Sequence, residues 1–168
     1  MNIILQEFIE TLKSFNLRSL TAQECINKVK PALQEICVDS SWLPEQYYAC
    51  SGDENVHVIY AEDPNDFMVL IDTWPGDFKG SKHNHNTWGV AGCLYGKERN
   101  NLFKLNNNGK LKFIESQDIG PGEISVMLPD VIHSVDNIMP KTDISISLHV
   151  YGRDLRHTDR HIYDEKKE

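Results

Sequence analysis

The sequence predicts an all-β domain, a sandwich or closed barrel, with a helical segment at its N-terminal side. Two observations carry this prediction. Apolar residues recur with a helical period in residues 2–50 and with a period of two from residue 55 onward. Turn residues then interrupt the chain at spacings of roughly 8 to 12 residues, which is typical of all-β sandwiches and barrels. The 168 residues show no linker or repeat, so we expect one domain, with a helical segment over residues 1–50 and a barrel over residues 55–155.

Two helices are expected in the N-terminal segment. In the first, apolar side chains recur every three or four positions, at Ile4, Phe8, Leu12 and Phe15. The second begins at Thr21, because its hydroxyl can cap the helix while the Glu24 carboxylate bonds back to the cap. Pro31 falls inside this second pattern, so we expect it to kink or divide the helix.

Eight short strands are expected after the helical segment. They are Asn55–Ala61, Phe67–Trp74, His85–Tyr95, Leu102–Leu105, Lys110–Ser116, Ile124–Leu128, Ile132–Val135 and Asp143–Tyr151. A small barrel made of such strands closes around an interior that can hold one ligand. Side chains that face this interior are therefore the first candidates for a functional site.

The composition argues against several classes of partner. A net charge of −8 at pH 7 disfavours nucleic acid and anionic membrane surfaces. No stretch approaches the ~20 apolar residues of a membrane span, and no signal-like segment opens the chain. The four cysteines lack C-x-x-C or zinc-finger spacing, which favours reduced, structural thiols. We expect a cytoplasmic monomer or small homo-oligomer that binds small molecules.

Three histidines are candidates for metal ligands. His83 and His85 stand at positions i and i+2 in a region that is expected to be a strand, so both side chains should point to one face. Two imidazoles on one face can take adjacent positions on a metal ion, and His133, about fifty residues further on, can supply a third ligand. The alternative is a pair of ordinary surface or core histidines, which is the commoner origin of an isolated H-x-H.

A second group of polar residues alternates along the last expected strand. Ser147, His149 and Tyr151 share one face of it, and apolar residues occupy the other. A polar row usually faces water. In a barrel with a polar pocket the same row can point inward, where each group needs a hydrogen-bond partner. Both readings are compatible with the alternation.

These motifs resemble those of the cupin superfamily. Gly96 follows the H-x-H, and a P-x-x-x-H-x-x-x-N pattern lies at Pro129, His133 and Asn137. The resemblance implies a double-stranded β-helix, or jelly-roll barrel. Many cupins carry a glutamate ligand a few residues after the H-x-H, where this sequence has Gly89 and Val90. The resemblance therefore implies a site of three histidines.

Within the cupins, the sequence resembles the thiol dioxygenases, which include cysteine dioxygenase and 3-mercaptopropionate dioxygenase. The resemblance spans about residues 55–155 and is carried by the three histidines and the S-x-H-x-Y run at Ser147, His149 and Tyr151. It implies that His83, His85 and His133 hold Fe(II), although imidazole also suits Zn or Ni, and Mn is a further alternative. It also implies that O₂ oxidises a small thiol to its sulfinic acid while the Tyr151 phenol lies beside the substrate.

The sequence departs from the family at two places. Mammalian-type enzymes have a cysteine soon after the H-x-H that is cross-linked to the tyrosine. Here Trp88-Gly89-Val90 occupies that region, so no thioether is expected. The T-W-G run resembles the mercaptopropionate branch, and we expect Trp88 at the substrate site.

The second departure concerns the substrate's carboxylate. His57 falls near the family's carboxylate-binding position, and Arg160 and Arg153 are the alternative cations. Arg160 is favoured because a guanidinium fork fits a carboxylate better than one imidazole does.

Two other functions remain compatible with the sequence. One is a cupin metalloenzyme that acts on a non-thiol substrate with Zn, Ni or Mn. The other is a non-catalytic cupin that contains a metal and binds a small molecule.

Overall fold

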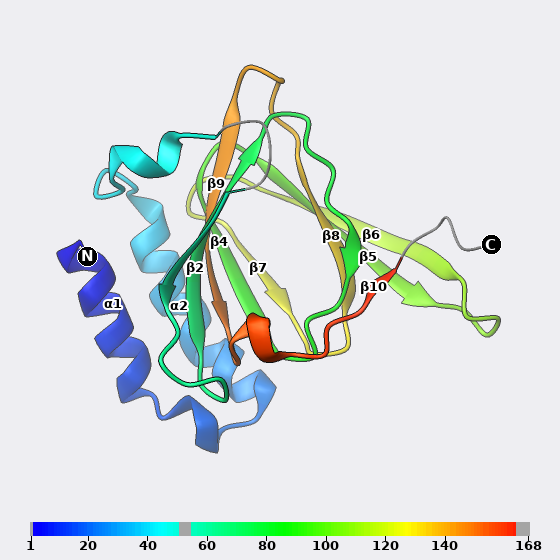
Figure 1. Ribbon diagram of the computed structural model, residues 1–168, viewed down its shortest axis with the longest axis horizontal. Coiled ribbons are helices and arrows are strands. Elements are labelled where there is room, and N and C mark those ends of the chain that lie inside the picture. Colours follow the sequence, from blue (N-terminus) through cyan, green and yellow to red (C-terminus); the bar gives the residue numbers. More distant parts are fainter. Residues whose placement is uncertain (1, 51–54, 164–168) are drawn as a thin grey trace.

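The computed structural model describes residues 2–50 and 55–163 and arranges them in a helical layer and two antiparallel β-sheets (Figure 1). The first sheet has the strand order β1-β2-β9-β4-β7, and the second has the order β10-β3-β8-β5-β6. The strands are β1 Asn55–Tyr60, β2 Met68–Pro75, β3 Lys82–His83, β4 Gly89–Tyr95, β5 Glu98–Leu105, β6 Leu111–Ile119, β7 Ile124–Met127, β8 Ile132–Asn137, β9 Ile144–Tyr151 and β10 Ile162–Tyr163. The predicted all-β architecture with an N-terminal helical region is confirmed.

The helical layer covers the outer face of the first sheet. It consists of α1 (Ile3–Ser14) and α2 (Ala22–Val38), with short 3-10 turns at Leu17–Ser19 and Glu45–Tyr48. The predicted capping box is confirmed, since Thr21 and Glu24 bond reciprocally at the start of α2. Pro31 does not divide this helix, contrary to one of the two outcomes expected of it. Pro31 is exposed while the opposite side of α2 packs on β4, and this burial offsets the hydrogen bond that proline removes.

The two faces of the first sheet enclose different surroundings. On the outer face, apolar side chains join those of the helices in one core that includes Val69, Ile71, Val90, Leu148 and Val150. On the inner face, a smaller cluster comprises Met68, Leu70, Ala91, Met127 and Tyr151. The alternation of successive side chains along each strand produces this division. The inner face looks toward the second sheet, so the space between the sheets is available for a site.

Several strand boundaries differ from those expected from the sequence. The described residues contain ten strands, and the two that were not expected, β3 and β10, have two residues each. The strand expected from His85 begins instead at Gly89, because the chain crosses from the second sheet to the first between β3 and β4. Asn86 adopts a left-handed conformation in this crossing, with φ of 51°. Within the part of the chain that the structure covers, no helix is long and apolar enough to span a membrane.

Candidate metal centre

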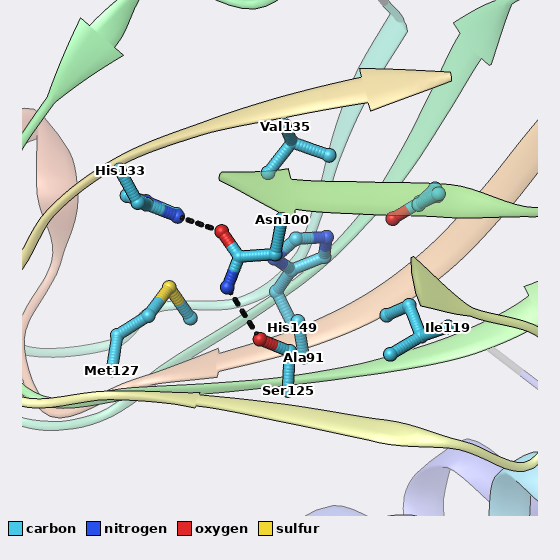
Figure 2. Close-up of a pocket in the computed structure, with 9 residues that line it drawn as sticks. Ala91, Asn100, Ile119, Ser125, Met127, His133, Val135 and His149 are labelled. Atoms are coloured by element: carbon cyan, nitrogen blue, oxygen red, sulfur yellow. Dashed lines mark hydrogen bonds between the residues drawn. The ribbon is translucent and has the colours of Figure 1, made fainter. Parts of the chain in front are cut away.

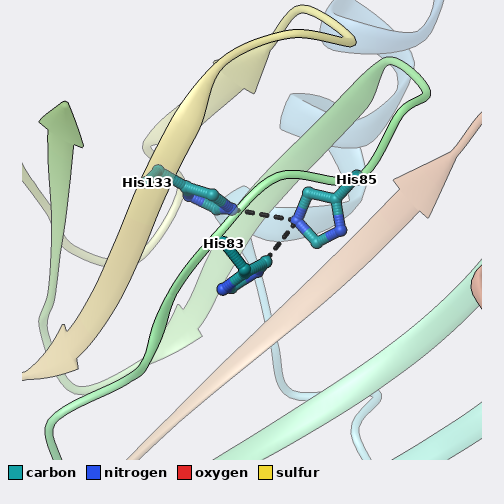
Figure 3. Close-up of side chains that lie close together, drawn as sticks. All are labelled: His83, His85 and His133. Atoms are coloured by element: carbon teal, nitrogen blue, oxygen red, sulfur yellow. Dashed lines mark hydrogen bonds between the residues drawn. The ribbon is translucent and has the colours of Figure 1, made fainter. Parts of the chain in front are cut away.

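Three imidazoles converge in the space between the sheets (Figure 3). The Nε2 atom of His85 lies 3.2 Å from that of His83 and 2.9 Å from that of His133. One nitrogen from each ring lies within 4.8 Å of the others, so the three histidines form a group that can hold a metal ion. His85 and His133 are buried and His83 is half-buried. The predicted set of three candidate ligands is therefore brought together.

The strands place two of the ligands, and a crossing segment places the third. His83 on β3 is the register partner of His133 on β8, so their side chains share one face of the second sheet. His85 lies beyond the end of β3, where a strand was expected. The two histidines of the H-x-H therefore do not share a strand, and the segment between β3 and β4 places the His85 ring beside those of His83 and His133.

A segment from later in the chain holds this crossing in place. The Asn84 backbone N–H donates to the His161 carbonyl at 3.1 Å, and the His161 N–H donates to the Asn84 side chain at 2.8 Å. The Asn86 amide also donates to the Asp159 carbonyl. Residues 159–163, which end in β10, therefore form a strap over the loop that carries His85.

Hydrogen bonds on the far side of two rings direct their Nε2 lone pairs toward the common centre. The Nδ1 of His83 lies 2.9 Å from the Ser81 carbonyl, and the Nδ1 of His133 lies 2.8 Å from the Asn100 Oδ1. Asn100 is itself fixed, because its amide nitrogen donates to the Ser125 hydroxyl at 2.6 Å (Figure 2). Both ring partners accept hydrogen bonds, so each Nδ1 carries the proton and each Nε2 is unprotonated.

Burial keeps the three rings in the neutral form that binds metals. It is the main cause of the lowered pKa of His83 and of His85, and it lowers the pKa of His133 to about 3. The neighbouring imidazoles and the charge of Arg160 act in the same direction on His85. Three neutral rings that face one another leave lone pairs in close contact, and a shared cation would satisfy all of them.

The spacing of the nitrogens is compatible with the coordination of one ion. Two nitrogens, each about 2.1 Å from an ion, lie about 3.0 Å apart at a right angle and about 3.4 Å apart at the tetrahedral angle. The separations of 3.2 and 2.9 Å from the His85 Nε2 lie near or between these two values. The three imidazoles therefore suit a transition-metal ion.

The Ser147–His149–Tyr151 row also points into the space between the sheets. The Ser147 Oγ lies 2.7 Å from the His149 Nε2, and the His149 Nδ1 lies 3.0 Å from the Tyr151 hydroxyl. Burial lowers the pKa of His149 to about 3, so this ring is also neutral. The Tyr151 ring lies next to the metal centre, with its centroid 4.6 Å from that of His85. Of the two readings of the alternating strand, the inward one holds.

Gly89 provides the room that the Tyr151 ring occupies. A Cβ atom at Gly89 would lie 2.8 Å from the ring's Cε1 and 2.9 Å from its Cδ1. The Cys93 thiol on β4 donates to the Tyr95 carbonyl at 3.4 Å.

A cavity of about 520 Å³ opens beside the metal centre. The three histidines, His149 and Tyr151 belong to its polar part, and apolar side chains that include Val58, Met68, Leu70, Trp74 and Phe78 line much of the remainder. The walls suit a small organic ligand that needs a few fixed polar contacts.

Among the expected substrate-binding residues, only Arg160 lines this cavity. Arg153 is exposed and donates to the Asn65 side chain at 3.0 Å, away from the cavity. Arg156 also lines the cavity, and its guanidinium is paired with the Asp154 carboxylate at 2.6 Å. Arg160 is thus the predicted cation that the fold brings to the cavity.

The other two expected residues lie elsewhere. His57 projects from β1 toward the helical layer. There its ring packs edge-on against that of Tyr47, with 5.0 Å between the ring centroids. Its strand neighbours Val56 and Val58 line the cavity, so alternation turns His57 away from it. Trp88 is 7% exposed and belongs to the outer apolar core. The structure brings neither residue to the cavity.

Three polar residues near the site were not identified from the sequence. Asp72 on β2 lines the large cavity, and its Oδ2 lies 3.7 Å from the His149 Nε2. Asn100 supports His133, and Glu98 is buried near Ser147. Asp72 could have been noticed in the sequence, because it is the one acid in the mostly apolar run 67–74.

The architecture is the cupin double-stranded β-helix. No family model matches the sequence. Among solved structures, the chain is similar to an uncharacterised conserved protein with a double-stranded β-helix domain from Klebsiella pneumoniae, with 15% identity, a TM-score of 0.52 and coverage of 72% of this chain and 94% of that one.

Two further structures show a similar chain path. Oxalate oxidase in complex with the substrate analogue glycolate has 12% identity and a TM-score of 0.50, over 63% of this chain and 54% of that one. Peruvianin-I, a cysteine peptidase from Thevetia peruviana latex, has 11% identity and a TM-score of 0.52, over 71% of this chain and 79% of that one. The chain spans about half the length of the oxalate oxidase chain, and identities this low establish the fold alone.

Proposed function

We propose that the protein is a mononuclear non-haem Fe(II) thiol dioxygenase that converts R–SH and O₂ to the sulfinic acid R–SO₂H. Both oxygen atoms end on sulfur, so no external reductant is needed. The observation that carries the proposal is the meeting, at one cavity, of three neutral imidazoles with the Ser147–His149–Tyr151 chain. The presence of an oxidase among proteins of this fold is compatible with an enzymatic role.

The residues around the centre have distinct tasks in this proposal. His83, His85 and His133 would hold the iron, which when bound favours the thiolate form of a thiol and reacts with O₂. The Tyr151 hydroxyl reaches the same space and can hydrogen-bond to substrate, while His149 fixes the orientation of the phenol. The apolar walls limit access of water to the reacting sulfur.

Arg160 suggests the class of thiol. It lies at the exposed side of the cavity and acts electrostatically on His83 and His85. A thiol that carries a carboxylate, such as 3-mercaptopropionate or cysteine, could place its sulfur at the histidines and its carboxylate toward this guanidinium.

The test is oxygen consumption after anaerobic reconstitution with Fe(II). We expect one O₂ consumed per thiol and a product 32 Da heavier than the thiol by mass spectrometry. A Zn(II)-loaded sample should consume no O₂, since zinc has no redox chemistry. Oxygen uptake with a non-thiol substrate would identify a different metalloenzyme. If Fe(II) binds and no small thiol or other substrate is turned over, the catalytic proposal is wrong and a binding role is the better description.

A further inference from the structure

Glu98 is a buried acid at the start of β5. Its exposed fraction is 2%, and it lines a small cavity. Three other residues that line this cavity, His133, Asn100 and His149, are labelled in Figure 2. Within the described part of the chain, its Oε1 has no hydrogen-bond partner. The Ser147 hydroxyl lies against its carboxyl group and stabilises the charged form. Glu98 therefore stands at the inner end of the chain that runs from Ser147 through His149 to Tyr151.

This chain can be ordered in two directions. A neutral imidazole has one N–H donor and one acceptor nitrogen, and both nitrogens of His149 are engaged. In the first direction Ser147 donates to Nε2, and Nδ1–H donates to the Tyr151 oxygen, which leaves the phenolic proton for the cavity. In the second, Tyr151 donates to Nδ1, and Nε2–H donates to Ser147, so the phenol offers only lone pairs to the cavity.

We propose that Glu98 is a positioning residue that sets the direction of this hydrogen-bond chain and hence whether the Tyr151 phenol can donate to a substrate. An ionised Glu98 only accepts hydrogen bonds, so it draws the Ser147 hydroxyl toward itself and selects the second direction. A neutral Glu98 can donate to the Ser147 oxygen and selects the first. The link to turnover rests on the proposed function, whereas the direction of the chain does not.

The surroundings of Glu98 make both of its forms accessible near neutral pH. Burial raises its pKa to about 7, against the opposing effect of the Ser147 and Ser145 hydroxyls. His133 on β8 and His149 on β9 have pKa values of about 3 and are neutral there. The Cys93 thiol on β4 has a pKa raised by burial and by the charge of Glu98, so it is neutral as well.

Asp72 on β2 is the other acid that faces this chain. Its Oδ2 lies 3.7 Å from the His149 Nε2 and favours a proton on that nitrogen. Asp72 therefore acts in the same direction as ionised Glu98, and a substitution at Glu98 separates the two contributions.

The direct test is the tautomer of His149 in the iron-free protein, read from two-bond ¹H–¹⁵N correlation spectra and assigned with the His149→Gln variant. In the wild type we expect the proton on Nδ1 at pH 6 and on Nε2 at pH 8.5, with a midpoint near the Glu98 pKa of about 7. Glu98→Gln should keep the proton on Nδ1 at both pH values, because the glutamine amide can donate to Ser147. Glu115→Gln, an exposed change on β6, is the matched control and should behave as wild type.

Ser147→Ala removes the connection and should make the tautomer independent of pH even with Glu98 present, so the test does not depend on how Glu98→Gln folds. In the iron-loaded enzyme, kcat should fall several-fold between pH 6 and pH 8.5 in the wild type, because the hydrogen bond that the phenol donates is lost, and it should stay level in Glu98→Gln. A His149 tautomer that is the same in the wild type at both pH values, or that shifts with pH in Ser147→Ala as in the wild type, would overturn the inference. Absence of thiol oxidation with the expected tautomer shift would count against the proposed function alone.

Discussion

Strand β9 buries two rows of side chains that face opposite sides of one sheet. Ile146, Leu148 and Val150 point to the helical layer, and each is 0% exposed. Ser147, His149 and Tyr151 point to the space between the sheets and are 0%, 3% and 4% exposed. Burial therefore does not distinguish the core from the candidate site. The apolar row stabilises the fold through lost water contact, whereas the polar row is tolerated because its members satisfy one another's hydrogen bonds.

The largest effect on the cavity side is expected from loss of a metal ligand. His133→Ala should weaken metal binding by roughly a thousandfold, because one of three ligands contributes several kcal/mol to the binding free energy. The barrel should stay folded, since the change lies outside the apolar core. Metal content after anaerobic reconstitution measures this effect, with the exposed His157→Ala as control. Full occupancy in His133→Ala would refute the three-histidine site.

The core side of β9 should respond in stability and not in binding. Leu148→Ala leaves a cavity among well-packed side chains, so we expect the free energy of unfolding to fall by about 2–5 kcal/mol in urea titrations. The folded fraction should bind metal normally. Ser147→Ala, one position away on the cavity side, should cost about 1 kcal/mol. Equal losses for the two variants would remove the distinction between the two rows.

At the far end of the cavity, Arg160→Ala tests recognition of a carboxylate. The KM for 3-mercaptopropionate should rise roughly tenfold, because a charged hydrogen bond is lost at a partly solvated position. The KM for cysteamine, which lacks a carboxylate, should change little. Arg153→Ala is the matched control, since that guanidinium does not line the cavity. The same KM for the acid in wild type and Arg160→Ala would mean that Arg160 does not bind substrate.

The smallest predicted change is at the end of the polar row. Tyr151→Phe removes one hydroxyl while the ring still fills the space over Gly89. Metal content should be unchanged. The kcat should fall several-fold, because the variant loses one neutral hydrogen bond that contributes about 1 kcal/mol. Steady-state oxygen uptake measures this. A variant with unaltered kcat would show that the phenol has no part in the reaction.

The sequence contained the parts of the site whose positions depend on strand register. The three histidines followed from their spacing, and the inward row of β9 was one of two readings of its alternation. His85 was correctly grouped with His83, although the strand expected to carry it begins only at Gly89 and His85 lies in the crossing between the sheets. Such a crossing depends on which sheet each strand joins, which local periodicity does not encode.

His57 and Glu98 illustrate two other limits of sequence patterns. The strand that carries His57 was predicted, but alternation alone does not tell which face meets the helices. Glu98 was missed because β5 begins with the polar run Glu98-Arg99-Asn100-Asn101, and the predicted strand began only at Leu102. Inward-facing polar residues hide a strand from a search for apolar alternation. The hydrogen-bond partners that compensate for the burial of such polar residues lie on strands that are distant in the sequence.

The strap formed by residues 159–163 has a consequence for the timing of assembly. All three histidines leave the ribosome before the strap does, because His133 precedes it by more than twenty residues. Until the strap has emerged, the loop around Asn84 and Asn86 lacks the hydrogen bonds that hold it against the barrel. Since chains fold progressively from the N-terminal side during synthesis, the helices and the β1–β2 pair can form early, whereas the first sheet is joined only when β9 is available. The candidate metal centre can therefore be fully braced only after the strap has been synthesised.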